Sequence, residues 1–302
     1  MRNRLFCAAL GWRKIHRPSS EWATAWLFVL PSVFFLIVFI IFPIAISIYY
    51  SFGTIKFWRG SIIYSFTGFA NYKNFFIEPS SLTTFIQTLL YTILRTAGSF
   101  LLGAGIALLM TYGGRVSKVF KLTFLLPWAI SYVVNSIMWN WMFHGSYGIL
   151  NEILVRMHII RNYQTWLASP GLTLYVIAFI DIWKNVPFTA LAIFAGLQNI
   201  PRELYDAAKI DGAGFLQQLW YIIVPYLFPL CIIVILFQLI WALRAFDSIW
   251  TLTKGGFGTD ILNIVIFRET FIYTRIGYGA AIAVILALLT LVFAIQLVKR
   301  VK

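Results

Sequence analysis

The chain has 302 residues, of which 61% are hydrophobic and 11% charged, and its formal net charge is +14. A soluble domain is typically about 45–50% apolar and about one quarter charged, so this composition excludes an ordinary soluble fold and indicates an integral membrane protein. The basic residues are dispersed rather than gathered in a stripe with interleaved aromatics, which argues against a nucleic-acid-binding surface.

Six apolar runs are long enough to cross a bilayer, which takes roughly 20 mostly apolar residues. They cover residues 22–50, 85–112, 121–143, 171–197, 221–245 and 276–298, and a basic tail, 1–21, precedes them. The first run is too long for the core of a signal peptide, so we expect it to remain as a span. The sequence therefore predicts an all-α, polytopic membrane protein, with one transmembrane domain over 1–302 and six helices within 22–298.

Basic residues set the predicted orientation, because cytoplasmic segments of membrane proteins are enriched in Lys and Arg. With both termini in the cytoplasm, the inner segments hold thirteen basic residues: Arg2, Arg4, Arg13, Lys14, Arg17, Arg115, Lys118, Lys121, Arg202, Lys209, Lys299, Arg300 and Lys302. The longer outer loops, about 51–84, 144–170 and 246–275, hold eight: Lys56, Arg59, Lys73, Arg156, Arg161, Lys254, Arg268 and Arg275. We therefore expect a multi-pass protein with both termini in the cytoplasm.

Residues 198–220 form a polar, helix-forming segment between the fourth and fifth runs. Pro201 suits a first helical turn, and Glu203 and Asp206 follow where the helix dipole favours anions. Leu204, Ala207 and Ala208 form one small apolar stripe at helical spacing, and the glycines at 212 and 214 end the helix. The segment fits a docking surface on a helix–turn–helix, and it equally fits an amphipathic turn on the lipid surface.

Several motifs in this order resemble those of type I ABC importer permeases, closest to the carbohydrate-uptake branch of maltose- and glycerol-phosphate-type permeases. The motif Asp206-Ala207-Ala208-Lys209-Ile210-Asp211-Gly212-Ala213, followed by Ile222-Ile223-Val224-Pro225, is similar to the family's Glu-Ala-Ala loop. Three further fragments resemble outer and mid-membrane motifs: residues 66–72 (Phe-Thr-Gly-Phe-Ala-Asn-Tyr), 126–130 (Leu-Pro-Trp-Ala-Ile) and 183–188 (Trp-Lys-Asn-Val-Pro-Phe). Thr253-Lys254-Gly255-Gly256 resembles the start of the last outer loop, and the likeness covers nearly the whole chain.

The resemblance implies a function and a set of partners. It implies a permease subunit of a binding-protein-dependent importer in a bacterial or archaeal cytoplasmic membrane, forming half of an alternating-access pathway for a sugar or polyol. It also implies a homologous permease, two ATP-binding subunits that hold ATP and Mg²⁺, and an extracytoplasmic solute-binding protein. Residues 198–220 would then couple to the ATPase, through Glu203, Asp206, Ala207, Ala208, Asp211 and Gly212. The chain departs from the family's usual pattern at Asp206 (usually Glu), Val224 (Leu) and Phe257 (Pro).

Ionisable residues inside spans are costly and suggest function. Asp181, Lys184 and Asn185 share one face of the fourth run, and Arg95 lies in the second. Two interpretations stay open: a structural Asp181–Lys184 pair with Arg95 adding a bond, or a polar lining of a solute pathway. The second would also use the amide and indole groups of Asn135, Trp139, Asn140, Gln238 and Trp241.

Catalytic and cofactor motifs are not found in the sequence. It has no Gly-x-x-x-x-Gly-Lys-[Ser/Thr] phosphate loop, and His16, His144 and His158 lack metal-ligand spacing. We therefore expect a non-catalytic subunit that binds no cofactor or metal itself. The alternatives are an ion-coupled secondary transporter, with Asp181 and Lys184 as carriers, and a membrane enzyme acting on lipid-linked sugars. The sequence leaves open which solute is carried and whether the second permease is a paralogue, which we favour, or an identical chain.

Overall fold

The computed structural model describes residues 19–58, 61–112 and 123–300. The predicted basic tail, except for its last three residues, lies outside this range together with His16. The predicted inner segment around Arg115, Lys118 and Lys121 lies outside it as well. The chain forms two compact units, residues 1–49 and 50–302, which are described separately.

The first unit is a helix without buried side chains among its described residues. It runs through α1 (Ser19–Leu36), a π-helical turn η1 (Ile37–Ile41) and the beginning of α2 (Phe42–Ser51). The π turn comes just before Pro43, where the Phe42 N–H bonds to the Ile37 carbonyl. Proline lacks an N–H and clashes with the carbonyl four residues back, and the wider turn accommodates it. The exposed apolar side chains of this helix suit a lipid environment.

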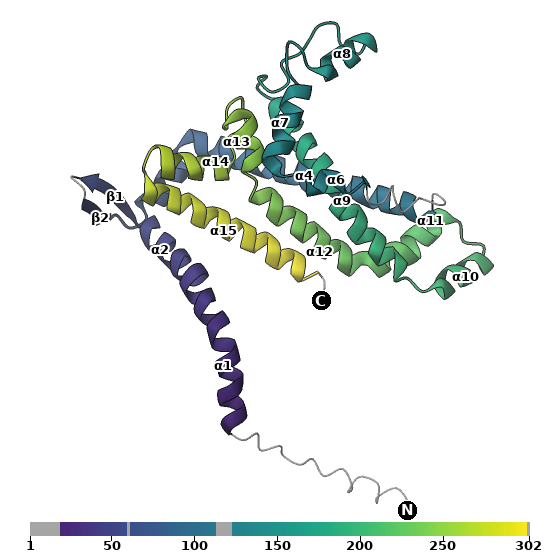
Figure 1. Cartoon of the computed structure of the whole chain (residues 1–302), viewed down its shortest axis with the longest axis horizontal. Coiled ribbons are helices and arrows are strands. Elements are labelled where there is room, and N and C mark those ends of the chain that lie inside the picture. Colours follow the sequence, from purple (N-terminus) through teal and green to yellow (C-terminus); the bar gives the residue numbers. More distant parts are fainter. Residues whose placement is uncertain (1–18, 59–60, 113–122, 301–302) are drawn as a thin grey trace, which may run out of the picture. The chain divides into compact units, whose positions relative to one another are not determined.

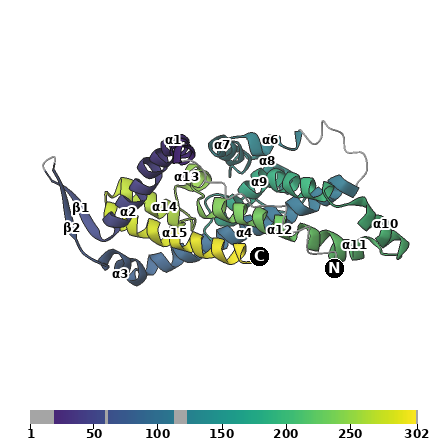
Figure 2. The ribbon, with the colours of Figure 1, turned by 90° about the horizontal axis from the view of Figure 1, so that it is seen from below.

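Four long helices build the second unit: α4 (Pro79–Tyr112), α9 (Thr173–Gln198), α12 (Val224–Leu243) and α15 (Ile276–Val298). Helices α4 and α9 pack against each other most extensively, and α12 packs on both (Figures 1 and 2). The polytopic helical fold is thus confirmed. Among the described residues, five helical segments are long and apolar enough to cross a membrane: 25–51, 79–112, 173–198, 215–253 and 276–298.

The third predicted run, 121–143, is not one continuous helix. Its described part holds α6 (Leu126–Ala129) and α7 (Tyr132–Met142), separated by two residues with extended backbone, Ile130 and Ser131. The Ser131 hydroxyl caps α7 by accepting from the Val134 N–H at 3.3 Å. A serine that caps the second helix fixes the break. The predicted count of six transmembrane helices is not confirmed.

The segments predicted as outer loops contain their own secondary structure. The first holds an antiparallel hairpin, β1 (Gly53–Trp58) and β2 (Ser61–Phe66), in which Ile55 pairs with Tyr64, and then α3 (Ala70–Ile77). The second holds α8 (Ile149–Arg156). The third holds α13 (Asp247–Thr253), α14 (Leu262–Phe267) and the π turn η3 (Arg268–Ile272). The hairpin is a departure from the all-α expectation.

Close approach of α4 and α9 depends on a glycine. A Cβ on Gly103 would lie 2.6 Å from Cβ of Thr189, whereas a Cβ on Gly105 would meet no atom within 4 Å. Of these two glycines, only Gly103 is therefore needed for helix packing. Thr189 in turn accepts a hydrogen bond at 2.8 Å from the buried Gln238 of α12, and this bond joins α12 to α9.

Candidate functional site

A polar cavity of about 410 Å³ lies where α4, α6, α7 and α9 meet the junction of α12 and α13. Charged, amide, hydroxyl and aromatic side chains line most of it: Arg95, Trp128, Tyr132, Asp181, Lys184, Asn185, Trp241, Arg244, Ala245, Phe246, Asp247 and Ser248. Asp181, Lys184 and Asn185 come from one face of α9, as helical spacing predicted. We call this the polar cavity.

The Asp181 side chain in the polar cavity accepts hydrogen bonds from neutral donors. Its Oδ2 accepts from the Tyr91 hydroxyl of α4 and from the Ser248 hydroxyl of α13 at 2.7 Å. The side chain is completely buried, and Oδ1 has no partner among the described residues. The carboxylate thus joins three helices by hydrogen bonds to hydroxyl groups, and it keeps one free acceptor atom.

The two buried cations do not pair with Asp181. Lys184 Nζ donates to the Trp128 carbonyl at 2.9 Å and lies 4.5 Å from the centre of the Tyr132 ring. Arg95 Nη2 donates to the Tyr132 hydroxyl at 3.0 Å, and that hydroxyl donates to Asn185 Oδ1 at 3.1 Å. Within the described part of the chain no salt bridge joins Asp181 to either cation. Of the two interpretations left open by the sequence, a direct Asp181–Lys184 salt bridge is not seen, because both side chains form hydrogen bonds to neutral partners.

The structure separates the predicted pathway residues into two groups. Asp181, Lys184, Asn185 and Trp241 line the polar cavity. The others lie elsewhere: Asn135 and Gln238 are fully buried between helices, Trp139 packs among aromatic rings, and Asn140 is exposed. Asn140 follows Trp139 directly, so a helix turns its side chain to a different face.

Several side chains of this site were missed from sequence. Tyr91 lies one helical turn before Arg95 on α4, and this spacing could have indicated that both share a face. Tyr132 and Ser248 gave no such signal. Tyr132 begins α7 after the unpredicted break, and Ser248 reaches Asp181 only because α13 folds back onto α9.

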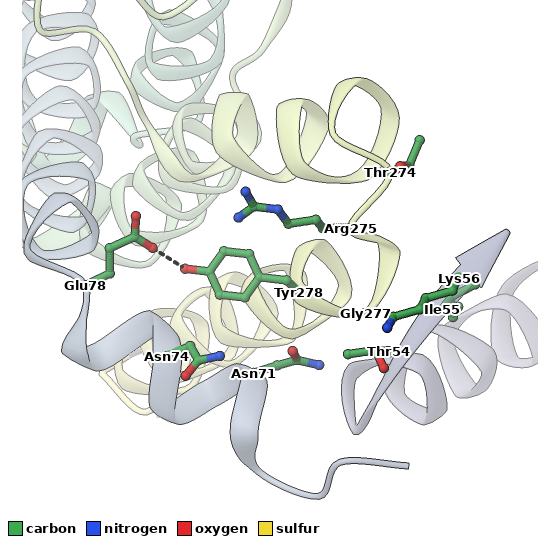
Figure 3. A pocket seen from close by; sticks show the side chains of 10 residues that line it. All are labelled: Thr54, Ile55, Lys56, Asn71, Asn74, Glu78, Thr274, Arg275, Gly277 and Tyr278. Atoms are coloured by element: carbon green, nitrogen blue, oxygen red, sulfur yellow. Dashed lines mark hydrogen bonds between the residues drawn. The ribbon is translucent and has the colours of Figure 1, made fainter. Parts of the chain in front are cut away.

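A second cavity, of about 670 Å³, lies between the hairpin, α3 and the start of α15 (Figure 3). Its polar groups mainly join neighbouring elements. Asn71 donates to the Ser51 and Gly53 carbonyls at 3.0 and 2.9 Å, and the Tyr278 hydroxyl donates to Glu78 at 3.0 Å. Arg275, which also lines this cavity, forms a salt bridge with the largely buried Glu269, with 3.4 Å between Nη1 and Oε2. The hydrogen bonds connect α3 to the end of α2, to β1 and, through Glu78, to the start of α15.

Within residues 198–220, helix α10 (Arg202–Ile210) has a well-defined end. Gly212 adopts a left-handed backbone with φ of 75°, its N–H bonds to the Lys209 carbonyl at 3.1 Å, and the Ala213 N–H bonds to the Ala208 carbonyl at 2.8 Å. This is the Schellman arrangement, in which glycine avoids the penalty of a side chain at positive φ. Helix α11 (Phe215–Gln218) follows and continues into α12 through the π turn η2 (Leu219–Ile223), just before Pro225. The predicted helix–turn–helix is thus present.

One face of α10 is attached to the long helices, and the other is exposed. Tyr205 and Ala208 face inward, and Tyr205 packs edge-on against Tyr112 at the end of α4. Burial raises the pKa of the Tyr205 hydroxyl. Leu204 and Ala207 are exposed, so the predicted stripe does not face inward as a unit.

The exposed surface of α10 and its end carries three carboxylates beside two basic residues, Arg202 and Lys209. Glu203, Asp206 and Asp211 are exposed, and Asp206 makes only a solvent-exposed pair with Lys209 at 3.5 Å. Isolated exposed pairs of this kind contribute little to stability. The carboxylates are therefore available to a partner.

Comparisons with known proteins agree with this architecture. The family model described as "Binding-protein-dependent transport system inner membrane component" matches residues 99–301. The chain is 37% identical to a probable ABC transporter permease of Pyrococcus horikoshii, covering 88% of this chain and 91% of that protein. It is 34% identical to the sulfoquinovosyl glycerol transport system permease of Agrobacterium fabrum, covering 88% and 86%.

A solved structure shows the same fold. A chain of a bacterial ABC transporter that imports the acidic polysaccharide alginate aligns with a TM-score of 0.79 at 21% identity, over 94% of this chain and 96% of that one. The family match and these relatives cover most of the sequence. The chain belongs to the family of binding-protein-dependent transport system inner membrane components, the permease subunits of ABC importers.

Proposed function

We propose that α10 is the element through which this permease receives force from a separate ATP-hydrolysing subunit. The observation that carries the proposal is the construction of α10: an exposed surface with three carboxylates, an inner face that holds Tyr205 and Ala208, and an end set by Gly212. The exposed surface of this helix combines the carboxylates of Glu203, Asp206 and Asp211 with the apolar side chains of Leu204 and Ile210. Such a mixture of polar and apolar groups suits a protein partner.

Movement of α10 would pass directly into the long helices. Ile200, at the entry to α10, is buried in an apolar cluster with Ala107 of α4, Ile193 of α9 and Leu227 of α12. The Tyr226 hydroxyl also donates to the Asn199 carbonyl at 3.0 Å, which joins α12 to the end of α9. A displacement of the docking helix therefore shifts the walls of the polar cavity between two packed states, as alternating access requires.

The solute in this proposal is a sugar or a related polyol that passes through the polar cavity. Relatives include permeases named for trehalose/maltose and for sulfoquinovosyl glycerol. The cavity combines the hydrogen-bonding groups of Asp181 and Asn185 with the rings of Trp128 and Trp241. Hydroxyls bond to amides and carboxylates, and the C–H faces of sugars pack on aromatic rings.

The working assembly would contain a homologous permease, two ATP-binding subunits that carry ATP and Mg²⁺, and an extracytoplasmic solute-binding protein. One solved relative by fold is a complex with an alginate-bound periplasmic protein. In this arrangement both termini and α10 face the cytoplasm, and the surface around the second cavity faces the binding protein. The chain itself is non-catalytic.

Gly212→Asp tests the docking role. An aspartate at positive φ strains the helix end and should abolish solute-stimulated ATP hydrolysis and uptake while leaving membrane insertion intact. Gly214→Asp is the matched control, because Gly214 has an ordinary φ of −73° and open space around it. Both variants are purified through a tag on this chain, and the co-purifying subunits are identified by mass spectrometry.

Three outcomes discriminate among the possible functions. Loss of coupled hydrolysis in Gly212→Asp alone supports the proposal. Unchanged uptake in Gly212→Asp contradicts the docking role. Uptake by the purified chain without any ATP-hydrolysing partner would indicate a secondary transporter instead.

A further inference from the structure

The polar cavity carries an excess of positive charge. Three cations line it, Arg95, Lys184 and Arg244, against two carboxylates, Asp181 and Asp247. Arg244 and Asp247 are exposed, whereas Arg95 and Lys184 are 1% and 4% exposed and Asp181 is fully buried. The buried part of the site therefore holds two cations and one carboxylate.

Arg95 has unused hydrogen-bonding capacity. Its Nη2 donates to Tyr132, but Nε and Nη1 have no partner among the described residues. A guanidinium offers five N–H donors in a planar fork, and it cannot lose its charge under ordinary conditions. A buried cation whose donors are unsatisfied is costly, and the described residues supply no acceptor for Nε and Nη1 of Arg95.

Asp181 interacts with Arg95 only through space and does not occupy its free donors. Its Oδ2 is occupied by the hydroxyls of Tyr91 and Ser248, and no salt bridge within the described residues connects it to Arg95 or Lys184. Lys184 is likewise directed to a carbonyl and an aromatic ring. Both buried cations are thus left with neutral partners.

We infer that the polar cavity takes a saccharide that bears an anionic group, a carboxylate, sulfonate or phosphate. This inference rests on the proposed function, in which the solute passes through this cavity. The anion accepts bonds from the fork of Arg95, with Lys184 adding charge. The free Oδ1 of Asp181 accepts from a sugar hydroxyl.

An aromatic wall completes the site. The Trp128 ring stacks on Phe188 with centroids 5.9 Å apart, and Phe188 meets Trp241 edge-on at 4.9 Å. Both tryptophans line the polar cavity. A pyranose ring can lie against this wall while its charged substituent reaches Arg95. The side chains therefore recognise both parts of an acidic sugar.

The test compares matched neutral and anionic sugars on the purified complex of permeases and ATPase subunits, without the binding protein. The complex is reconstituted in nanodiscs of phosphatidylcholine. The probes are glucose, glucuronate, glucose 6-phosphate and 6-sulfoquinovose, with cellobiose and cellobiouronate as a disaccharide pair, and binding is measured by titration calorimetry. At least one anionic sugar should bind about tenfold tighter than its neutral counterpart, which corresponds to about 1.4 kcal/mol.

Substitutions test whether Arg95 causes the preference for anionic sugars. Arg95→Gln should reduce the preference to about twofold or less, and Arg95→Lys should retain part of it because the charge remains. Arg156→Gln is the control, since Arg156 is exposed on α8 and pairs there with Glu152 at 2.6 Å. It should keep the full preference. The wild-type comparison needs no variant, so misfolding of Arg95→Gln does not remove the test.

The remaining outcomes overturn the inference in distinguishable ways. Equal or tighter binding of neutral sugars refutes the anionic class and leaves the proposed sugar pathway intact. Binding of none of the probes refutes both. A preference that persists in Arg95→Gln places anion recognition elsewhere. Loss of anionic-sugar binding when phosphatidylglycerol is added to the nanodiscs identifies a lipid headgroup as the occupant instead.

Discussion

Replacing Gly103 by alanine should loosen the contact between α4 and α9. The new Cβ would lie 2.6 Å from Cβ and Cγ2 of Thr189 and 3.1 Å from the backbone nitrogen of Ala190. These atoms belong to a β-branched side chain with restricted χ1 and to helical backbone, so neither moves aside easily. Overpacking of this kind typically costs about 1–3 kcal/mol.

The effect should spread to a third helix. Thr189 Oγ1 accepts the hydrogen bond from Gln238 Nε2, and Gln238 Oε1 has no partner among the described residues. Displacing Thr189 would leave a buried amide without its bond, and an unsatisfied buried group costs about 1–3 kcal/mol. The α12 contact therefore weakens together with the α4–α9 contact.

Gly105→Ala is the matched control on the same helix. A Cβ at position 105 meets nothing within 4 Å, so this variant gains helix propensity, at most about 1 kcal/mol, without a clash. Both changes gain the same propensity, so the difference between the two variants reports packing alone. Thermal unfolding of the purified protein should show a lower melting temperature for Gly103→Ala than for Gly105→Ala. Equal melting temperatures would refute the account of how α4 and α9 pack.

Substitutions at three further positions test other contacts. Ser248→Ala removes a donor to the buried Asp181 and should destabilise the protein by about 1–3 kcal/mol in thermal unfolding, whereas no loss would mean that this bond is dispensable. Tyr205→Ala should reduce coupled ATP hydrolysis because α10 loses its ring contact with Tyr112. Tyr205→Phe keeps the ring and should retain the activity. Equal activity of the two variants would count against a role for that contact. Burial raises the pKa of Glu269, so the wild type should lose stability as pH rises from the ordinary Glu value, about 4.3, through the raised folded value. Glu269→Gln should abolish that loss, and the same pH response in both proteins would contradict this.

Local features of this chain could be predicted from its sequence, because local physics decides them. The end of α10 at Asp211–Gly212 follows from the glycine, and the shared face of Asp181, Lys184 and Asn185 follows from helical spacing. The apolar runs predicted the long helices because a helix that crosses a bilayer must be both long and hydrophobic.

Features that depend on distant residues could not be predicted in this way. Asp181 pairs with Tyr91 and Ser248, which lie 90 and 67 residues away, instead of with Lys184 three residues along its own helix. The break at Ile130–Ser131 falls within a run that is long and apolar enough to cross a bilayer, and Pro127 and Ser131 alone did not reveal where it lies. Tyr205 of α10 faces inward because its ring packs against Tyr112 of α4, a residue far away in the sequence.

Site-specific photo-cross-linking from α10 tests the docking claim most directly. Ile210 is 86% exposed at the end of this helix, so a photoreactive residue there disturbs no buried contact. In the purified complex we predict that position 210 captures the ATP-hydrolysing subunit, with a yield that changes when ATP is added. A photoreactive residue at Leu101, exposed in the middle of α4, should never capture that subunit. Capture of lipid alone from position 210 would contradict the account.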